Sequence, residues 1–389
     1  MFKIRTYNAI SSKGLDRFAR DQYEIASEFN EPDAYILRSQ KLHGEPVPAS
    51  VVAVARAGAG TNNIPVEEYT GRGIVVFNTP GANANAVKEL ILAGLLLGSR
   101  DIYGGINYVQ GLTEMTDAAE MGKLLEAQKK HFAGGEIVGK TLGIVGLGAI
   151  GSLVANMAVE LGMKVIGYDP AISVEAAWQL SSRVERMENL QTLLGRSDFI
   201  TLHVPAIEAT RHLINSETLT GMRPSAKILN FAREEIVDTT ALLAALDAGQ
   251  LGGYVTDFPR PELLGRKDVI TMPHIGASTA EAEENCAVMA ADQLMDFLED
   301  GNIRNSVNYP KTVMERNGGT RITFSNNNVP KVLGSVLAVL AEGELNVLDM
   351  VNKSRGDVAY NIVDVEGEVT EALRAAIAAV DGVTHVRVL

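Results

Sequence analysis

The first part of the chain alternates short apolar runs with polar or glycine-rich turns. YILRS (35–39), VVAVARAG (51–58) and GIVVFNTP (73–80) have the length and β-branched content of buried strands. From Asn85 the apolar residues recur at helical spacing, in AVKELILAGLLLGSRDI (86–102). Because apolar residues occupy nearly every side of this predicted helix, we expect it to be buried between two layers.

The middle of the chain repeats strand and helix patterns. Residues 139–170 form the clearest strand–helix–strand unit, and further strand candidates are FITLHV (199–204), KILNFA (227–232), GGYVTDF (252–258) and DVITMP (268–273). A helix is expected from about Ala280 to Asp300. Strand and helix alternation predicts a parallel sheet with right-handed crossovers, so the fold class is α/β.

The last seventy or so residues have a different order. KTVMERNGG (311–319) carries no apolar periodicity and is predicted to be a linker. Beyond it the pattern is strand, helix, strand, strand, helix, strand, which is the order of a ferredoxin-like βαββαβ domain.

Composition and charge exclude several classes of protein. Of the 389 residues 46% are hydrophobic and 21% charged, which is ordinary globular usage, and the net charge of −13 makes nucleic acid an unsuitable partner. The single cysteine, Cys286, leaves no intrachain disulfide and no thiolate metal site, so we expect no metal and a reducing compartment. The start has no signal-peptide core, and the longest uncharged apolar stretch, Leu90–Gly98, is about half of the ~20 residues of a membrane span. We therefore expect a cytoplasmic protein without membrane contact.

A dinucleotide signature lies inside the clearest strand–helix–strand unit. Gly146, Gly148 and Gly151 form G-x-G-x-x-G between an apolar strand and a helix, and the next strand ends at Asp169. The glycines permit a tight turn, close approach of a pyrophosphate and helix–strand packing, and the helix N-terminus supplies free N–H donors. Asp169 accepts hydrogen bonds from a ribose and repels a 2′-phosphate, which favours NAD over NADP. The alternative is a plain glycine turn with Asp169 as a cap.

Three further groups with suitable chemistry follow predicted strands. Arg233 follows KILNFA, Asp257 and Glu262 follow GGYVT, and His274 follows DVITMP. Ligands of open parallel sheets bind beyond the carboxyl ends of strands. Oxidation of a secondary alcohol needs a base, for which histidine is suited, a carboxylate that orients its ring, and an arginine fork that holds a carboxylate.

At these residues the sequence resembles the D-isomer-specific 2-hydroxyacid dehydrogenases, and within them the short D-3-phosphoglycerate dehydrogenases. The resemblance runs nearly end to end and rests on the following segments: RAGAGTNNIP (56–65), FNTPGANANAVKEL (77–90), GLGAIG with YDP, LHVP (202–205), FAREEIVD (231–238), LGGYVTDFPRPE (251–262), MPHIGAST (272–279) and GNIRNSVNYP (301–310). It implies two Rossmann-like or flavodoxin-like parallel-sheet domains. These are a substrate-binding domain (1–88 and 285–310) and an NAD-binding domain (89–284), followed by the linker (311–319) and the C-terminal domain (320–389).

The resemblance also implies roles for individual residues. Arg233 holds the substrate carboxylate, His274 is the acid/base, and Glu262 is its partner, with Asp257, expected near the nicotinamide carboxamide, as the alternative partner. The implied cofactor contacts are Gly146, Gly148, Ala149, Ile150, Gly151, Asp169, Val204, Pro205, Ala232, Asp257 and Gly276. The implied substrate contacts, for the phosphate and carboxylate, are Arg38, Arg56, Gly58, Gly60 and Asn83.

The chain departs from the family pattern at three places, one of which is the short loop that puts His274 only twelve positions after Glu262. Glu234 follows Arg233 where the family usually has glycine, which puts an extra carboxylate beside the anion site, and Phe258 and Pro259 change the order around Glu262. Simpler interpretations stay open: Arg233 as a surface ion-pair partner, His274 as a structural residue, and Arg38 or Arg56 singly as solvated charges. Three further side chains are expected to be structural: His203 lining the cofactor crevice, Trp178 packed against a helix and Cys286 buried on the 280–300 helix.

The C-terminal segment resembles an ACT domain, through NVPKVLGSVL (328–337) and GELNVLDM (343–350). Such domains pair edge to edge and bind an amino acid between partners, which implies a homodimer or homotetramer and an effector site at Asn326, Asn328 and Asn346. The alternative is a domain that only assembles subunits.

Together these features predict NAD-dependent oxidation of 3-phospho-D-glycerate to 3-phosphohydroxypyruvate, the entry to serine synthesis. Two alternatives stay open: the same chemistry on another D-2-hydroxy acid, or a non-enzymatic, NAD-gated binding protein of the same fold.

Overall fold

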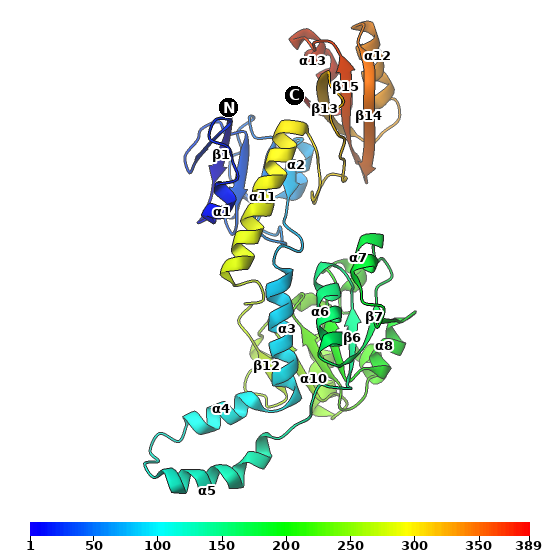
Figure 1. Cartoon of the computed structure of the whole chain (residues 1–389). Helices are drawn as coiled ribbons and strands as arrows, with labels where there is room; N and C mark the ends of the chain where they lie inside the picture. Colours follow the sequence, from blue (N-terminus) through cyan, green and yellow to red (C-terminus); the bar gives the residue numbers. More distant parts are fainter. The chain divides into compact units, whose positions relative to one another are not determined.

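The computed structural model describes the backbone of residues 1–389 and every side chain except that of Glu175. The chain forms two compact units, which are taken one at a time (Figure 1). Unit 1 comprises Met1–Asn83 and Thr279–Leu389, and unit 2 comprises Ala84–Ser278. The chain therefore passes between the units at two points, after Asn83 and after Ser278.

The N-terminal part of unit 1 is a parallel sheet in the strand order β2-β1-β3-β4-β5, the flavodoxin-like order. Its strands are β1 (Phe2–Thr6), β2 (Tyr23–Ala26), β3 (Ala34–Leu37), β4 (Ala53–Arg56) and β5 (Val75–Phe77). Its helices are α1 (Ser12–Leu15), α2 (Val66–Gly71) and the long α11 (Ala280–Asp300). Because β3 and β4 are neighbours, the residues that end them lie at one edge of the sheet.

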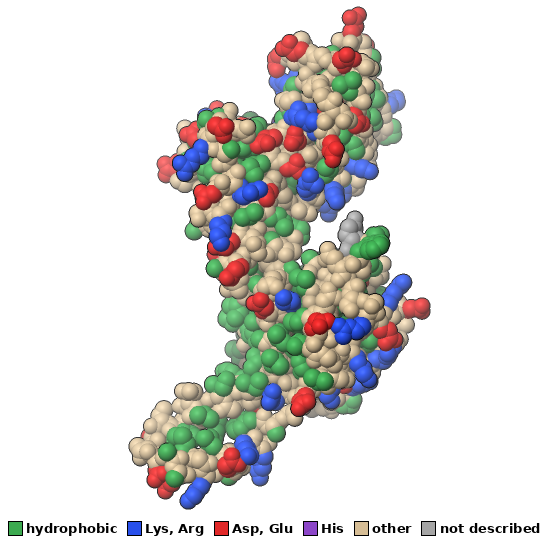
Figure 2. Space-filling view, in the orientation of Figure 1, with side chains coloured by type: hydrophobic (Ala, Val, Ile, Leu, Met, Phe, Trp, Pro, Cys, Tyr) green, Lys and Arg blue, Asp and Glu red, His purple; other side chains and the backbone are tan. Residues whose placement is uncertain are grey.

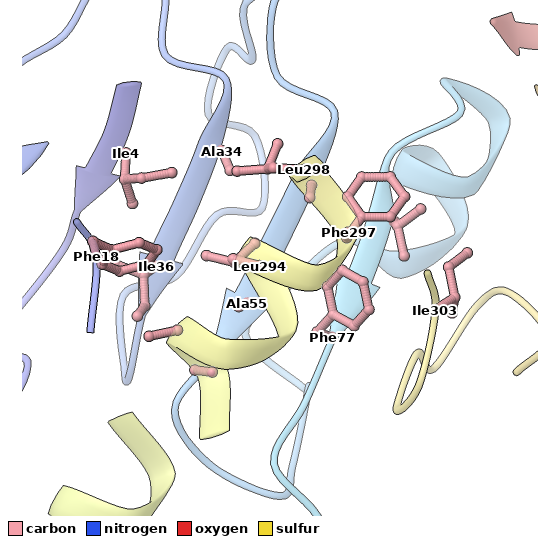
Figure 3. Packing of buried hydrophobic residues seen from close by; sticks show 14 of the residues in the cluster. Ile4, Phe18, Ala34, Ile36, Ala55, Phe77, Leu294, Phe297, Leu298 and Ile303 are labelled. Carbon is pink, nitrogen blue, oxygen red and sulfur yellow. The ribbon is translucent and has the colours of Figure 1, made fainter. Parts of the chain in front are cut away.

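Helix α11 supplies one side of the core of unit 1. Its residues Leu294, Phe297 and Leu298 face the sheet residues Ile4 and Phe77 (Figure 3), and all five are at most 2% exposed. The rings of Phe77 and Phe297 meet edge to face, with centroids 5.6 Å apart. Cys286 is buried on the same helix, as predicted.

Unit 2 contains a seven-stranded parallel sheet in the order β12-β11-β10-β9-β6-β7-β8. This is the Rossmann arrangement extended by one strand. Its strands are β6 (Thr141–Val145), β7 (Lys164–Tyr168), β8 (Glu185–Arg186), β9 (Phe199–Leu202), β10 (Lys227–Asn230), β11 (Gly253–Thr256) and β12 (Val269–Thr271). The predicted α/β class with two parallel-sheet domains is confirmed.

The helices of unit 2 connect these strands. They are α3 (Ala84–Ser99), α4 (Ile102–Gln110), α5 (Ala118–Gln128), α6 (Ala149–Glu160), α7 (Val174–Gln179), α8 (Leu190–Arg196), α9 (Ser216–Thr220) and α10 (Thr239–Asp247), with short 3₁₀ turns η1 (Lys129–Phe132), η2 (Glu208–Thr210), η3 (Glu234–Ile236) and η4 (Pro261–Leu263). The sequence predicts that α3 is buried between two layers, but within this unit Leu96 on α3 is 38% exposed. One side of α3, with Ile91 and Leu95, packs into the core of the unit.

Unit 2 contains one feature that the sequence patterns do not predict and one side chain that departs from its prediction. Helices α4 and α5 form a hairpin that projects from the sheet, with apolar side chains on its surface (Figures 1 and 2), and Tyr103 is 60% exposed. Asp117 starts α5 by accepting hydrogen bonds from the amides of Ala119 and Glu120, a cap that the polar composition of 112–136 concealed. Trp178 was expected to pack against a helix, but its side chain is 85% exposed.

The C-terminal part of unit 1 is an antiparallel sheet in the order β14-β15-β13-β16 with two helices, the ferredoxin-like arrangement that the sequence predicts. Its elements are β13 (Thr320–Asn327), α12 (Val332–Glu342), β14 (Asn346–Arg355), β15 (Val358–Glu366), α13 (Glu371–Ala378) and β16 (Val383–Val388). We call residues 320–389 the C-terminal module.

The C-terminal module caps the end of α11. Arg387 donates to the carbonyls of Phe297 (2.9 Å) and Leu298 (2.7 Å), and the Tyr360 hydroxyl donates to that of Gly301 (2.8 Å). The Phe297 carbonyl already accepts from the amide of the C-cap residue Gly301, so the module adds further donors to the carbonyls at the end of α11.

A buried ion pair fixes the same junction. Arg321 forms a bidentate pair with Asp364 (2.7 and 2.8 Å), and both side chains are fully buried. The Arg321 guanidinium also donates to the carbonyls of Asp300, Met314 and Glu315. One side chain therefore ties α11, the 311–319 segment and the module together.

In the part of the chain that the structure describes, no helix is long and apolar enough to cross a bilayer. Among the described side chains, no cluster of His, Cys, Asp and Glu is arranged to hold a metal ion.

Candidate functional site

The glycine loop of unit 2 has the geometry that its sequence requires. Gly146 follows β6 with φ of 92°, and a Cβ there would lie 2.5 Å from the carbonyl oxygen of His203. A Cβ on Gly151 would lie 2.0 Å from the carbonyl oxygen of Gly146. Both positions exclude a side chain, because the turn and the helix behind it are packed against each other.

Gly148, the middle glycine of the motif, lies in a more open environment, and this environment decides whether a dinucleotide fits. Gly148 is exposed at the N-cap of α6, and no heavy atom comes within 4 Å of a Cβ built on it. Because glycine has no side chain, the N-cap residue does not cap the first amides of the helix. A free helix N-terminus beside an uncovered glycine suits a pyrophosphate. The predicted contacts Ala149 and Ile150 start this helix, so the residues present fit an NAD pyrophosphate.

Asp169 ends β7 and holds the glycine loop. Its carboxylate accepts hydrogen bonds from the amides of Leu147 (2.8 Å) and Ala171 (2.9 Å). Each carboxylate oxygen can accept more than one hydrogen bond, so Asp169 can still receive ribose hydroxyls. Position and chemistry both fit the role that the sequence predicts.

His203, Val204 and Pro205 follow β9 next to the glycine loop. The His203 imidazole Nε2 lies 2.9 Å from the Thr201 hydroxyl, and burial lowers the pKa of His203 to about 3. A histidine that stays neutral at physiological pH fits a structural residue. Val204 lies against Gly146, with its Cγ1 3.0 Å from a Cβ at that glycine, while Pro205 is exposed.

The loop that carries Arg233 is anchored by Asn230, the last residue of β10. The fully buried Asn230 amide donates to the carbonyl of Arg233 (2.9 Å) and accepts from the amide of Ala232 (3.2 Å). The Arg233 guanidinium donates to the Ala232 carbonyl at 2.6 Å and is half-buried. Sequence reasoning did not identify Asn230, because a strand-end asparagine carries no distinctive signal.

The loop that carries His274 is anchored by Asp257, which follows β11. The buried Asp257 carboxylate accepts hydrogen bonds from the amides of Ile275 (2.8 Å) and Gly276 (2.6 Å). A Cβ on Gly276 would approach Asp257 Oδ2 to 3.1 Å, so the glycine permits this contact. His274 itself has φ of 55°, a conformation uncommon for a residue with a side chain, and Asp257 fixes the backbone that follows it.

The exposed imidazole of His274 packs against a neighbouring ring. Its centroid lies 5.0 Å from that of Phe258, with the rings tilted by 59°. Phe258 directly follows Asp257, so one loop holds both the backbone and the ring of His274. The sequence shows the position of Phe258 but gives no signal for this contact.

Glu262 lies in η4 and is 50% exposed. Its carboxylate is 3.7 Å from Arg260 Nε, and Arg260 Nη1 in turn donates to Glu234 Oε1 at 2.9 Å. Among the described side chains, Glu262 and His274 share no hydrogen bond or ion pair. The structure thus brings Arg233, Asp257 and His274 to the ends of the neighbouring strands β10, β11 and β12. Glu262 lies farther along the loop after β11, in η4.

In unit 1, two cations follow neighbouring strands. Arg56 ends β4 and donates to the Arg38 carbonyl (2.9 Å) and to Asn62 (3.2 Å), and Arg38, which follows β3, pairs with Glu283 at 2.6 Å. Gly58 and Gly60 are half-buried in the next loop, and Asn83 is the last residue before unit 2.

The three asparagines of the C-terminal module differ in environment. Asn326 is buried and accepts a 2.7 Å hydrogen bond from Asn361. Asn328 and Asn346 are exposed and bond within the module, to the carbonyl of Gly356 and to Glu366.

Comparisons with known proteins agree with this geometry. The family described as "D-isomer specific 2-hydroxyacid dehydrogenase, NAD binding domain" matches residues 105–276. The D-3-phosphoglycerate dehydrogenase of Synechocystis sp. is 34% identical over 96% of this chain and 68% of its own length. That of Haemophilus influenzae is 31% identical over 99% of this chain and 94% of its own. The chain belongs to the D-3-phosphoglycerate dehydrogenase family.

A solved structure supports the same conclusion at the level of the fold. The NAD⁺-bound 3-phosphoglycerate dehydrogenase of Entamoeba histolytica superposes with a TM-score of 0.60 at 26% identity, covering 79% of this chain and 98% of that one. Members of the D-3-phosphoglycerate dehydrogenase family are NAD-dependent oxidoreductases, and this chain is one of them.

Proposed function

We propose that the protein oxidises 3-phospho-D-glycerate to 3-phosphohydroxypyruvate. The observation that carries the proposal is the convergence of Arg233, Asp257 and His274 at the ends of three adjacent strands, in a chain whose relatives have this activity in their names. The reaction removes a proton from the C2 hydroxyl and a hydride from C2. When bound, NAD supplies the hydride acceptor.

His274 is the base in this proposal. It accepts the hydroxyl proton, so it has to be neutral when the oxidation begins. Asp257 holds the amides of Ile275 and Gly276 and thereby sets where the imidazole stands. Glu262 is the carboxylate proposed to stabilise the imidazolium.

Arg233 is the residue proposed to hold the substrate carboxylate. A guanidinium fork binds a carboxylate through two parallel hydrogen bonds, which fixes C2 and its hydroxyl in one orientation. The anchoring of its loop by Asn230 supports this role, because a side chain that orients the substrate has to be carried by a rigid loop.

Residues of unit 1 are proposed to receive the phosphate. Arg56 and Arg38 supply the cations, and Asn83 with the amides of Gly58 and Gly60 supply neutral donors. The residues proposed to hold NAD are the glycine loop, Asp169, Val204, Pro205, Ala232 and Gly276.

We further propose a cytoplasmic homodimer or homotetramer with an amino-acid effector at Asn326, Asn328 and Asn346. Since Asn326 is buried, an effector there has to displace its bond to Asn361.

The proposal is tested by NADH absorbance with 3-phospho-D-glycerate and with D-glycerate, which lacks the phosphate. We expect turnover of both, with a kcat/KM at least about 100-fold higher for the phosphorylated acid, since charge-assisted hydrogen bonds to the phosphate are lost with glycerate. Equal kcat/KM values would instead indicate a different D-2-hydroxy acid as the substrate. Absence of NADH formation with either acid would contradict the proposed reaction.

A further inference from the structure

A three-membered charge network lies beside the proposed carboxylate clamp. Arg260 donates from Nη1 to Glu234 at 2.9 Å and lies with Nε 3.7 Å from Glu262. Glu234 directly follows Arg233, and Glu262 is the proposed partner of His274. We propose that Arg260 is a specificity-determining residue that neutralises Glu234, so that the anionic substrate can bind at Arg233. This inference rests on the proposed function.

The network joins loops that the sheet already places together. Glu234 lies in η3 after β10, and Arg260 precedes η4 after β11. These strands pair in parallel with Asn230 opposite Thr256, so the two loops leave the sheet at the same edge. The Asn230 carbonyl also accepts from the amide of Asp257 (3.1 Å), which fixes the spacing of the loops.

The charges explain why the network is needed. Without a partner, the Glu234 carboxylate would be next in the chain to the guanidinium that is to hold an anion, and it would both repel the substrate and compete for Arg233. Arg260 draws this carboxylate away, and among the described side chains Glu234 has no ion pair with Arg233. The positive charge of Arg260 offsets the charge of Glu234. The three side chains together then carry one net negative charge, that of Glu262.

Exposure of the network determines how its effect is measured. The side chains of Arg260, Glu234 and Glu262 are 40%, 48% and 50% exposed. Exposed ion pairs contribute little to folding stability, so variants are expected to fold. Their field on a multiply charged ligand still matters at low ionic strength and is screened by salt. A purely structural role for Arg260 would show no such salt dependence.

The test is steady-state kinetics of Arg260→Gln, Glu234→Gln and the double variant at 20 mM and 500 mM salt. At low salt Arg260→Gln should raise KM for 3-phosphoglycerate about three- to tenfold while kcat stays within about twofold. The double variant should return KM to within about twofold of wild type, and Arg260→Lys should restore it in part. At high salt the differences should shrink to less than twofold.

A matched control separates this effect from a general loss of charge. Arg196 forms an exposed pair of the same kind with Glu185 at the opposite end of the sheet, and Arg196→Gln should leave KM unchanged. The inference is overturned if Arg260→Gln leaves KM at its wild-type value, or if the double variant keeps the raised KM. Absence of wild-type turnover would instead overturn the proposed function, so the two failures are distinct.

Discussion

The Asp257 carboxylate accepts a 2.6 Å hydrogen bond from the amide of Gly276, two residues after His274. Its other oxygen accepts from the amide of Ile275, so both oxygens of a buried acid hold the segment after the proposed base. Asp257 therefore acts on the backbone of the His274 loop in this structure. A carboxylate that fixes a loop can set the position of a base without touching its ring.

Replacing Asp257 by asparagine should impair the reaction without unfolding unit 2. Asparagine keeps one acceptor and presents an NH₂ group to the second amide, so the loop shifts and kcat should fall roughly 10- to 100-fold. The matched control is Asp117→Asn, because Asp117 also accepts from two backbone amides but on the projecting hairpin. Wild-type kcat in Asp257→Asn would contradict this assignment.

The three loop glycines should respond differently to alanine. Gly151→Ala places a Cβ 2.0 Å from a backbone oxygen and should lower both thermal stability and NAD affinity. Gly148→Ala meets no atom within 4 Å, so it should keep the stability and weaken NAD binding alone. Calorimetry of unfolding and of NAD titration separates the two. Unchanged NAD affinity in Gly148→Ala would argue against a pyrophosphate at this loop.

The buried Arg321–Asp364 pair should be essential to the junction of α11 and the C-terminal module. Arg321→Met leaves a buried carboxylate without its cation, which should cost about 3–5 kcal/mol. Cys286, the sole cysteine, lies buried on α11, so its rate of labelling by a thiol reagent reports opening of unit 1. Labelling should accelerate strongly in Arg321→Met.

The control for this variant is Arg316→Met, which removes the exposed Arg316–Asp300 pair of the same junction. Its effect on unfolding should stay below about 1 kcal/mol. Equal labelling rates in the two variants would show that the buried pair does not hold the junction.

Two histidines should make the protein sensitive to acid. Burial lowers the pKa of His203 to about 3, and burial with the nearby Arg387 and Arg374 lowers that of His385 to about 4. In the unfolded chain both titrate near ~6.5. Below that pH the unfolded state binds protons that the folded state does not, so stability falls as pH drops from about 6.5 toward about 4.

The size of this effect is measured by the slope of unfolding free energy against pH. Each histidine contributes up to about 1.4 kcal/mol per pH unit within its window. His203→Asn and His385→Asn should each reduce the slope. A wild-type slope in both variants would show that these histidines take up protons in the folded state.

Much of the fold follows from apolar periodicity, because strands between tight turns and the 280–300 helix leave clear patterns. The sequence also places Gly146, Asp169, Arg233 and His274 at strand ends, where chemistry requires them. Trp178 shows where pattern fails: whether a single aromatic is covered depends on neighbours distant in sequence. The hairpin of α4 and α5 was missed because neither helix has a buried residue, so no core pattern marks them.

The contacts that position the site are less predictable than its members. Phe258 against His274 and Arg260 between two acids depend on the relative placement of loops after β10, β11 and β12. Glu234 beside Arg233 looks unfavourable in sequence, and only the structure shows that Arg260 offsets it. Spacing along the chain carries no information about such pairs.

The most direct test uses 3-phospho-D-glycerate labelled with deuterium at C2, incubated with the full-length protein and NAD. Mass spectrometry of the reduced cofactor should find the deuterium transferred to it, with 3-phosphohydroxypyruvate as the other product and nearly all turnover lost in His274→Ala at unchanged NAD affinity. Reduced cofactor without deuterium, or His274→Ala at wild-type rate, would contradict the proposed reaction and the role of this histidine.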